Sequence, residues 1–159
     1  MAADELQLLP VEPGYKNVLR VRTAVLGLVV AGLAFVADRV LLAPIGFGGL
    51  LAAIGFLLAI TLIVIVPQRA YRRLRYGMGD RLLQVVRGWL FHTATVVPLI
   101  RVQHLDVVRG PVDKMFGTAS LVVHTAGTHN SIVTVPGLAP GRAAEMRDII
   151  RQHVSTDAA

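Results

Sequence analysis

The chain has 159 residues, of which 54% are hydrophobic and 16% are charged, and its formal net charge at pH 7 is +6. This length corresponds to about one domain, and the hydrophobic fraction is high for a soluble globular protein. Cysteine is absent, which excludes a disulfide framework, a thiolate metal site and a cysteine nucleophile.

Two apolar runs near the N-terminus hold the excess of hydrophobic residues. No charged residue occurs from Thr23 to Ala37 or from Val40 to Pro67. A helix needs about 20 mainly apolar residues to cross the hydrocarbon layer, so the second run is long enough. The first run extends back to Leu19 because flanking arginines can place their head groups at the interface. We therefore expect an N-terminal tail over residues 1–18 and a two-helix transmembrane hairpin over residues 19–67.

A cleaved signal peptide is the alternative interpretation of the first run. Lys16, Arg20 and Arg22 precede an apolar stretch of suitable length. However, the segment before that stretch is long and contains acidic residues, and Phe35 occupies the third position before a cleavage after Ala37. The membrane-spanning interpretation is therefore favoured.

A turn between the spans is indicated by Asp38 and Arg39 and by the proline- and glycine-containing stretch from Ala43 to Gly49. Small residues recur four apart, which lets helix backbones approach closely in lipid. These pairs are Gly27 with Ala31, Gly48 with Ala52, and Gly55 with Ala59. Because glycine and alanine are common in membrane helices in any case, no oligomer is predicted from them.

Basic residues predict the orientation of the hairpin. They flank its outer ends, while the turn offers only Arg39, next to Asp38. The flanking residues are Lys16, Arg20 and Arg22 before the first span, and Arg69, Arg72, Arg73 and Arg75 after the second. Because positive residues favour the cytoplasmic side, we expect a multi-pass protein of the inner membrane with both termini in the cytoplasm.

The chain after Arg69 is predicted to form a mainly β domain over residues 69–154, with a short tail over residues 155–159. Strand-like patterns are separated by glycine-containing turns. They cover Arg81 to Phe91 with a bend at Gly88, Val97 to Pro111, Ser120 to Gly127, and Ser131 to Leu138, with a hairpin turn over Gly127 to Asn130.

A helix is predicted after these strands, with Pro140 at its first position. Its apolar side is expected to cover one opening or face of the sheets. That side comprises Ala143, Met146, Ile149, Ile150 and His153.

The order of motifs resembles the bacterial pleckstrin-homology (PH) domains of YdbS-like membrane proteins, in which a transmembrane hairpin precedes the domain. The resemblance covers nearly the whole chain. It is carried by "YRRLRY" (71–76), Gly88, "VPLIRVQHLDVVRGPV" (97–112), "FGTASLVVHTAG" (116–127) and "VPGL" (135–138). Thr118 stands where the family usually has leucine, and Lys114 where an arginine is usual. The resemblance implies two nearly orthogonal antiparallel sheets capped by the terminal helix, and no particular chemistry.

Polar residues in the 97–112 stretch have two interpretations. Arg101 and Gln103 are favoured as structural residues that satisfy open carbonyl groups at a sheet corner, with Gly110 and Pro111 in the turn that follows. The alternative is that Arg101, Gln103 and Arg109 form a docking edge for another protein.

Catalytic and metal-binding patterns are weak. His104 and Asp106 lie two apart on one strand, and His124 and His129 flank the predicted hairpin turn, but no third ligand has a recognisable spacing. No serine lies in a nucleophile motif, and the glycines from Gly46 to Gly49 lack the lysine of a phosphate loop. The sequence therefore predicts no enzyme, no metal and no cofactor.

The basic residues Arg69, Arg72, Arg73 and Arg75 favour anionic phospholipid over nucleic acid as a partner, because they adjoin a predicted span. Membrane topology alone is slightly favoured as the explanation of these residues, and both roles can hold at once. A eukaryotic-type inositide site is not favoured, since the turn Gly77 to Arg81 provides only Arg81, next to Asp80.

The sequence thus predicts a membrane-anchored, cytoplasm-facing PH-like module that binds or assembles proteins, with a membrane protein or a second copy as partner. The alternatives are a sensor of anionic lipid headgroups and an accessory subunit of a larger membrane complex.

Overall fold

The computed structural model describes residues 7–88, 91–126 and 132–157, with side chains as far as residue 154. It divides into two compact units. Lys16–Arg69 form a helical hairpin, while Met1–Tyr15 and Ala70–Ala159 belong to the second unit.

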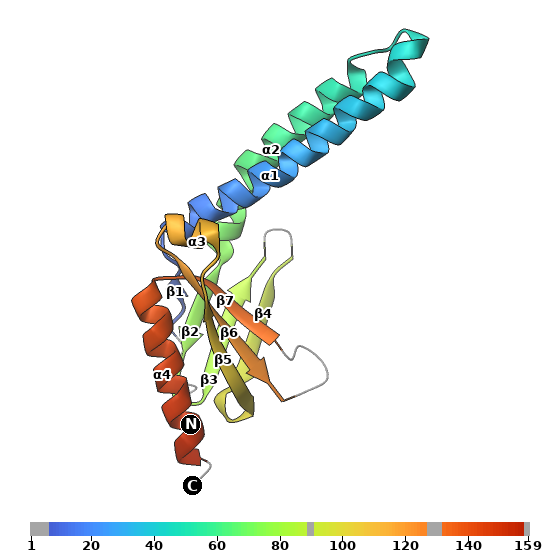
Figure 1. Ribbon diagram of the computed structural model, residues 1–159. Helices are drawn as coiled ribbons and strands as arrows, with labels where there is room; N and C mark the ends of the chain where they lie inside the picture. Colours follow the sequence, from blue (N-terminus) through green and yellow to red (C-terminus); the bar gives the residue numbers. More distant parts are fainter. Residues whose placement is uncertain (1–6, 89–90, 127–131, 158–159) are drawn as a thin grey trace. The chain divides into compact units, whose positions relative to one another are not determined.

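The hairpin consists of α1 (Gly14–Ala37) and α2 (Leu50–Arg73) (Figure 1). A π-helical turn (Asp38–Leu42) and a 3-10 turn (Ala43–Ile45) extend the first helix, so Val40, predicted to begin the second span, still belongs to the first. The helical conformation ends at Gly46, whose φ of 85° is in the left-handed region. Gly14–Ile45 and Leu50–Arg73 are each long and apolar enough to cross a membrane.

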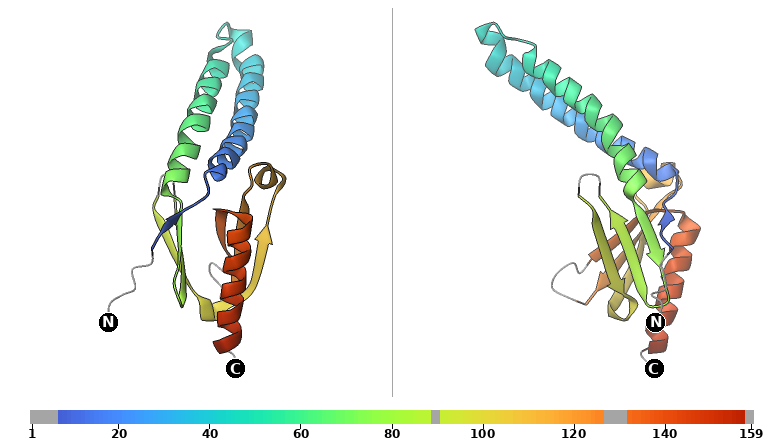
Figure 2. Two further views of the ribbon diagram at one scale, coloured as in Figure 1. Left: turned by 90° about the vertical axis from the view of Figure 1, so that its left-hand side faces the viewer. Right: turned by 180° about the vertical axis from the view of Figure 1, so that it is seen from behind.

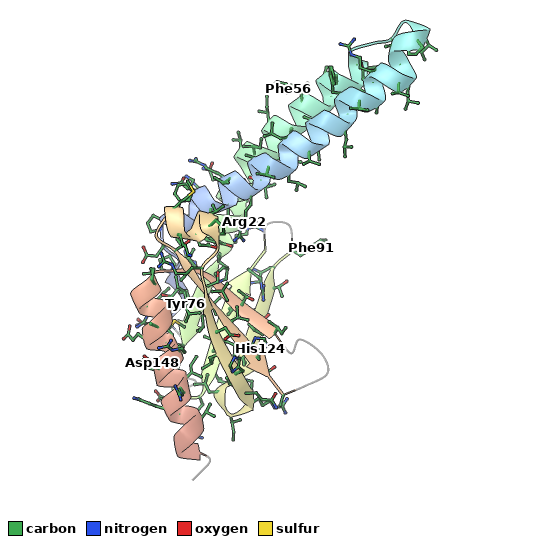
Figure 3. All side chains as sticks on the ribbon, in the orientation of Figure 1. Arg22, Phe56, Tyr76, Phe91, His124 and Asp148 are labelled. Atoms are coloured by element: carbon green, nitrogen blue, oxygen red, sulfur yellow. The ribbon has the colours of Figure 1, made fainter. Side chains whose placement is uncertain are left out.

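Small residues let the two helices approach closely. A Cβ atom on Gly27 would lie 3.0 Å from Ile63 Cδ1, and one on Gly55 would meet the Cβ of Ala34. Gly48 instead lies near Ala43 in the connecting turn. Larger apolar side chains remain on the outside, as Phe56 in α2 shows with 60% of its surface exposed (Figure 3). This distribution, with small residues inside and large apolar residues outside, is typical of a hairpin surrounded by lipid.

Asp38 closes the far end of the hairpin and is only 1% exposed. Its two carboxylate oxygens accept hydrogen bonds from the backbone N–H groups of Gly49, at 2.7 Å, and Leu51, at 3.0 Å. These donors lie at the N-terminus of α2, where backbone N–H groups have no partner within the helix. Asp38 therefore caps α2 from eleven residues upstream.

The second unit contains two antiparallel sheets and a C-terminal helix. The first sheet has the order β1-β2-β3-β4 and the second the order β5-β6-β7. The first-sheet strands are β1 (Leu9–Pro10), β2 (Arg75–Met78), β3 (Leu82–Arg87) and β4 (Thr93–Pro98). Those of the second sheet are β5 (Val102–Val108), β6 (Ala119–Thr125) and β7 (Ile132–Leu138).

The predicted strand from Val97 to Pro111 is wrong as a single element. Its first residues complete β4, a 3-10 turn (Leu99–Arg101) follows, and β5 begins at Val102 in the other sheet. Leu99 is 3% exposed at this corner, and the carbonyl of Arg101 accepts a hydrogen bond from Ala126 N–H. Burial of Leu99 thus fixes the point where the chain changes sheets.

The N-terminal segment is part of this unit, although the sequence predicted a tail. Leu9 and Pro10 pair with Tyr76 and Arg75 of β2. Tyr15 is 6% exposed and contacts Gly137 so closely that a Cβ atom there would lie 2.6 Å from the ring. This contact explains why position 137, with φ of 73°, carries glycine.

Helix α4 (Pro140–Asp157) lies along the opening between the two sheets (Figure 2). Ala143, Met146 and Ile150 are fully buried, which confirms the predicted apolar side, and Pro140 is the first helical residue. His153, predicted for the same side, is exposed and its Nδ1 lies 2.9 Å from the Ile149 carbonyl oxygen. The core of the domain is formed where α4 meets inward-facing residues of both sheets, including Leu83, Val85, Leu121, Val123 and Val135.

A short helix, α3 (Pro111–Met115), replaces the turn predicted at Gly110 and Pro111. Asp113 is 3% exposed, and its carboxylate accepts hydrogen bonds from the Gly110 N–H at 3.2 Å and from the Thr118 hydroxyl at 3.1 Å. Thr118 is fully buried. A buried polar group needs a hydrogen-bond partner, and the Asp113 carboxylate is the partner of the Thr118 hydroxyl.

Candidate functional site

The basic cluster, defined as Arg69, Arg72, Arg73 and Arg75, lies where α2 ends and β2 begins. All four side chains are exposed. Arg72 and Arg73 are in the last turn of α2, where positive charge also interacts favourably with the helix dipole. The structure thus brings the four predicted lipid-facing residues together in a short segment.

The predicted docking residues occupy three different settings. Arg101 ends the 3-10 turn and Gln103 lies in β5, and both are exposed. No hydrogen bond joins either side chain to another residue in the ranges 7–88, 91–126 and 132–154, so their predicted role in satisfying corner carbonyls is not seen there. Arg109 follows β5, and its Nε donates to the Thr118 carbonyl oxygen at 3.3 Å. Arg101 and Gln103 are therefore available at the surface, whereas Arg109 also has a structural contact.

A groove separates β5 from the C-terminal half of α4. Its cavity volume is about 510 Å³. The lining residues are Val102, Gln103, His104 and Leu105 from β5, and Arg147, Arg151 and Val154 from α4. The groove thus combines apolar side chains with two guanidinium groups.

The histidines predicted to flank a metal site form a polar cluster on the second sheet. His104 and His124 are directly opposite on β5 and β6, with ring centroids 5.7 Å apart (His124 is labelled in Figure 3). Asp106 Oδ1 lies 3.0 Å from His104 Nε2, and Oδ2 lies 3.4 Å from His124 Nε2. His129 is outside the described residues. Within those residues, no group of three His, Cys, Asp or Glu side chains is arranged to hold a metal ion.

The sequence pattern of the family described as "Bacterial PH domain" matches residues 20–154. The chain belongs to the bacterial PH domain family. It is 32% identical over 107 residues to the UPF0699 transmembrane protein YdbS of Bacillus subtilis (strain 168), an alignment that covers 67% of this chain and 65% of that protein. No solved structure matches the chain.

The family match confirms the resemblance found in the sequence, and it extends over most of the hairpin as well as over the two sheets and α4. Together with the transmembrane relative and the two long apolar helices, it makes this chain a membrane protein with a bacterial PH domain. The aligned region spans less than two thirds of the relative's length, and the relative's name assigns no activity.

Sequence reasoning missed two features of this bacterial PH domain. The groove lies between β5 and α4, whose lining residues are about forty residues apart in the chain. No local sequence pattern encodes that proximity. The contribution of residues 9–15 was also missed, although Leu9, Val11 and Tyr15 are apolar residues in the segment predicted to be an N-terminal tail.

Proposed function

We propose that this chain is a non-enzymatic, membrane-anchored PH module that faces the cytoplasm and binds proteins at the inner-membrane surface. The observation that supports this best is the exposure of Arg101 and Gln103 beside the groove between β5 and α4. Arginine is enriched in protein interfaces, and a concave surface beside it offers a place for a partner's side chains. The partner is a membrane protein, a subunit of a larger membrane complex or a second copy of this chain.

The proposed orientation has a direct test. A reporter active only in the cytoplasm should be active when fused after Ala159 and silent when inserted at Phe47, which is 66% exposed in the turn between α1 and α2. The reason is the excess of basic residues at the ends of the hairpin away from this turn. The opposite pattern of activity would overturn the cytoplasmic assignment.

Protein docking predicts a specific set of losses on purification. The full chain is cross-linked in cells, purified in gentle detergent and analysed by mass spectrometry. We expect Arg101→Glu to lower the amount of co-purifying partner protein at least about tenfold, because it reverses a charge at the exposed corner. Replacing Arg72, Arg73 and Arg75 by glutamine should leave the partners intact. Arg87→Glu, an exposed β3 position, is the matched control for a single charge reversal.

A sensor of anionic headgroups is the second candidate function, favoured by the exposed basic cluster. Each arginine near an anionic leaflet contributes about 1 kcal/mol of attraction, which salt weakens. The assay is co-flotation of neutral nanodiscs carrying the full chain with vesicles of phosphatidylglycerol or phosphatidylcholine. Since the hairpin already anchors the domain, we expect little added affinity for the anionic vesicles. Strong flotation that is lost in the triple glutamine variant, with no partner sensitive to Arg101, would establish the lipid sensor instead.

A further inference from the structure

Strand β5 has an open edge. In the second sheet β5 pairs with β6, and among the described residues no strand pairs with its other side. An edge strand presents a row of backbone N–H and C=O groups that can pair with a further extended chain. Figures 1 and 2 show α4 running beside this edge of the sheet. A groove remains between α4 and β5. The helix therefore lies next to the edge of β5 without occupying the space beside it.

The groove is suited to a peptide in its chemical composition. Leu105 and Val154 supply apolar surface beside the buried Val102, while Gln103 and His104 add polar groups along the strand. The register of β5 against β6 shifts between Val102 and His104, which is the mark of a β-bulge at Gln103. A bulge re-aims the side chain that it carries, in agreement with the exposure of Gln103 at the groove.

The charge of the groove selects the kind of peptide. No aspartate or glutamate is among its lining residues, whereas two arginines of α4 are. Arg147 already pairs with Asp148 at 2.8 Å. Arg151 is exposed and pairs with no carboxylate among residues 7–88, 91–126 and 132–154. A ligand carboxylate would therefore meet an uncompensated guanidinium, which binds carboxylates through paired N–H donors.

We propose that the groove between β5 and α4 binds an extended acidic segment of a partner protein, which adds as a strand to the open edge of β5. The backbone of the segment pairs with β5, an apolar side chain occupies the surface formed by Leu105 and Val154, and a carboxylate binds Arg151. This is the β-strand-addition mode of peptide recognition, in which backbone bonds supply affinity and the flanking pockets supply specificity. The inference rests on the proposed protein-docking function and names its partner class.

The test uses the full chain in nanodiscs of phosphatidylcholine and labelled octapeptides. The first probe alternates valine with glutamate, the second alternates valine with lysine, and two further versions of the first are N-methylated at the valines or at the glutamates. We expect saturable binding of the acidic probe and binding at least about tenfold weaker for the lysine probe, since the latter opposes Arg151. N-methylation of one set should cause a similar loss, because it removes the donors that face the strand edge.

Two variants locate the binding. Arg151→Gln should weaken the acidic probe about tenfold, while Arg142→Gln, which lies on the same helix outside the groove, should leave it unchanged. Arg151→Glu should bind the lysine probe better than the parent does. Bound acidic probe should also slow amide hydrogen exchange at residues 102–105 of β5.

The inference is overturned if neither N-methylated version loses affinity, if Arg151→Gln binds as the parent does, or if protection appears away from β5. Competition by anionic vesicles would assign the groove to lipid, and nanodisc self-association that blocks the acidic probe would assign it to a second copy. The proposed function can hold even if this inference fails. If Arg101→Glu loses the partners while no peptide binds at β5, docking takes place at the corner instead. If Arg101→Glu retains the partners and Arg151→Gln retains the acidic probe, both the proposed function and this inference are overturned.

Discussion

Replacing Ile150 by aspartate is expected to lower the free energy of unfolding of the PH domain by about 3–5 kcal/mol. Ile150 is fully buried where α4 covers the sheets. The aspartate would place an unpaired carboxylate among apolar side chains and would also remove their contacts with isoleucine. Thermal unfolding of the full chain in detergent measures the change. Hydrogen exchange of the β6 amides is a second measurement of the same loss of stability.

His153→Asp is the control for this substitution, because the sequence assigned both residues to the same side of the helix. Since His153 is exposed, its replacement should change the free energy of unfolding by less than about 1 kcal/mol. If Ile150→Asp unfolds like the parent, α4 does not pack against the sheets as described.

Replacing Asp38 by alanine is expected to destabilise the helical hairpin by about 2–4 kcal/mol. The alanine would leave the N–H groups of Gly49 and Leu51 without the carboxylate that accepts from both. In low-dielectric surroundings such donors are costly to leave without a partner. The measurement is hydrogen exchange at Gly49 and Leu51 in detergent, together with the thermal unfolding of the hairpin.

Asp38→Asn and Arg39→Ala separate capping from other effects. Asparagine keeps one acceptor oxygen and should retain part of the stability, with faster exchange at one of the two amides. Arg39 is exposed, with its guanidinium 5.0 Å from the centre of the Phe35 ring, so its removal should cost less than about 1 kcal/mol. Equal amide protection in the parent and in Asp38→Ala would show that the cap does not stabilise α2.

Local sequence patterns predicted much of this architecture. The two uncharged runs indicated the helical hairpin because length and apolarity along one helix are local properties. The spacing of Ala143, Met146 and Ile150 predicted the buried side of α4 for the same reason. Gly88 was predicted as a bend, and its φ of 135° confirms a conformation that favours glycine.

Strand boundaries were less predictable. The stretch from Val97 to Pro111 alternates along its length, but its break at Leu99 depends on two sheets meeting at that residue. Short strands such as β2 were not recognised, because four residues provide too little periodicity to separate a strand from a loop. The predicted hairpin turn from Gly127 to Asn130 lies outside the described residues.

The amino-acid sequence by itself determined the membrane hairpin, the closing helix and the membership of the bacterial PH domain family, since each depends on residues that are close in the chain or on the order of motifs. Tertiary structure alone decided that Leu9 and Pro10 pair with β2, that Asp38 caps α2, and that β5 and α4 border a groove with Arg151 at its rim. The physical reason is that hydrogen bonding and burial between distant segments depend on how the sheets and helices pack, and a local pattern holds no record of which distant group will satisfy a backbone donor or face an open strand edge.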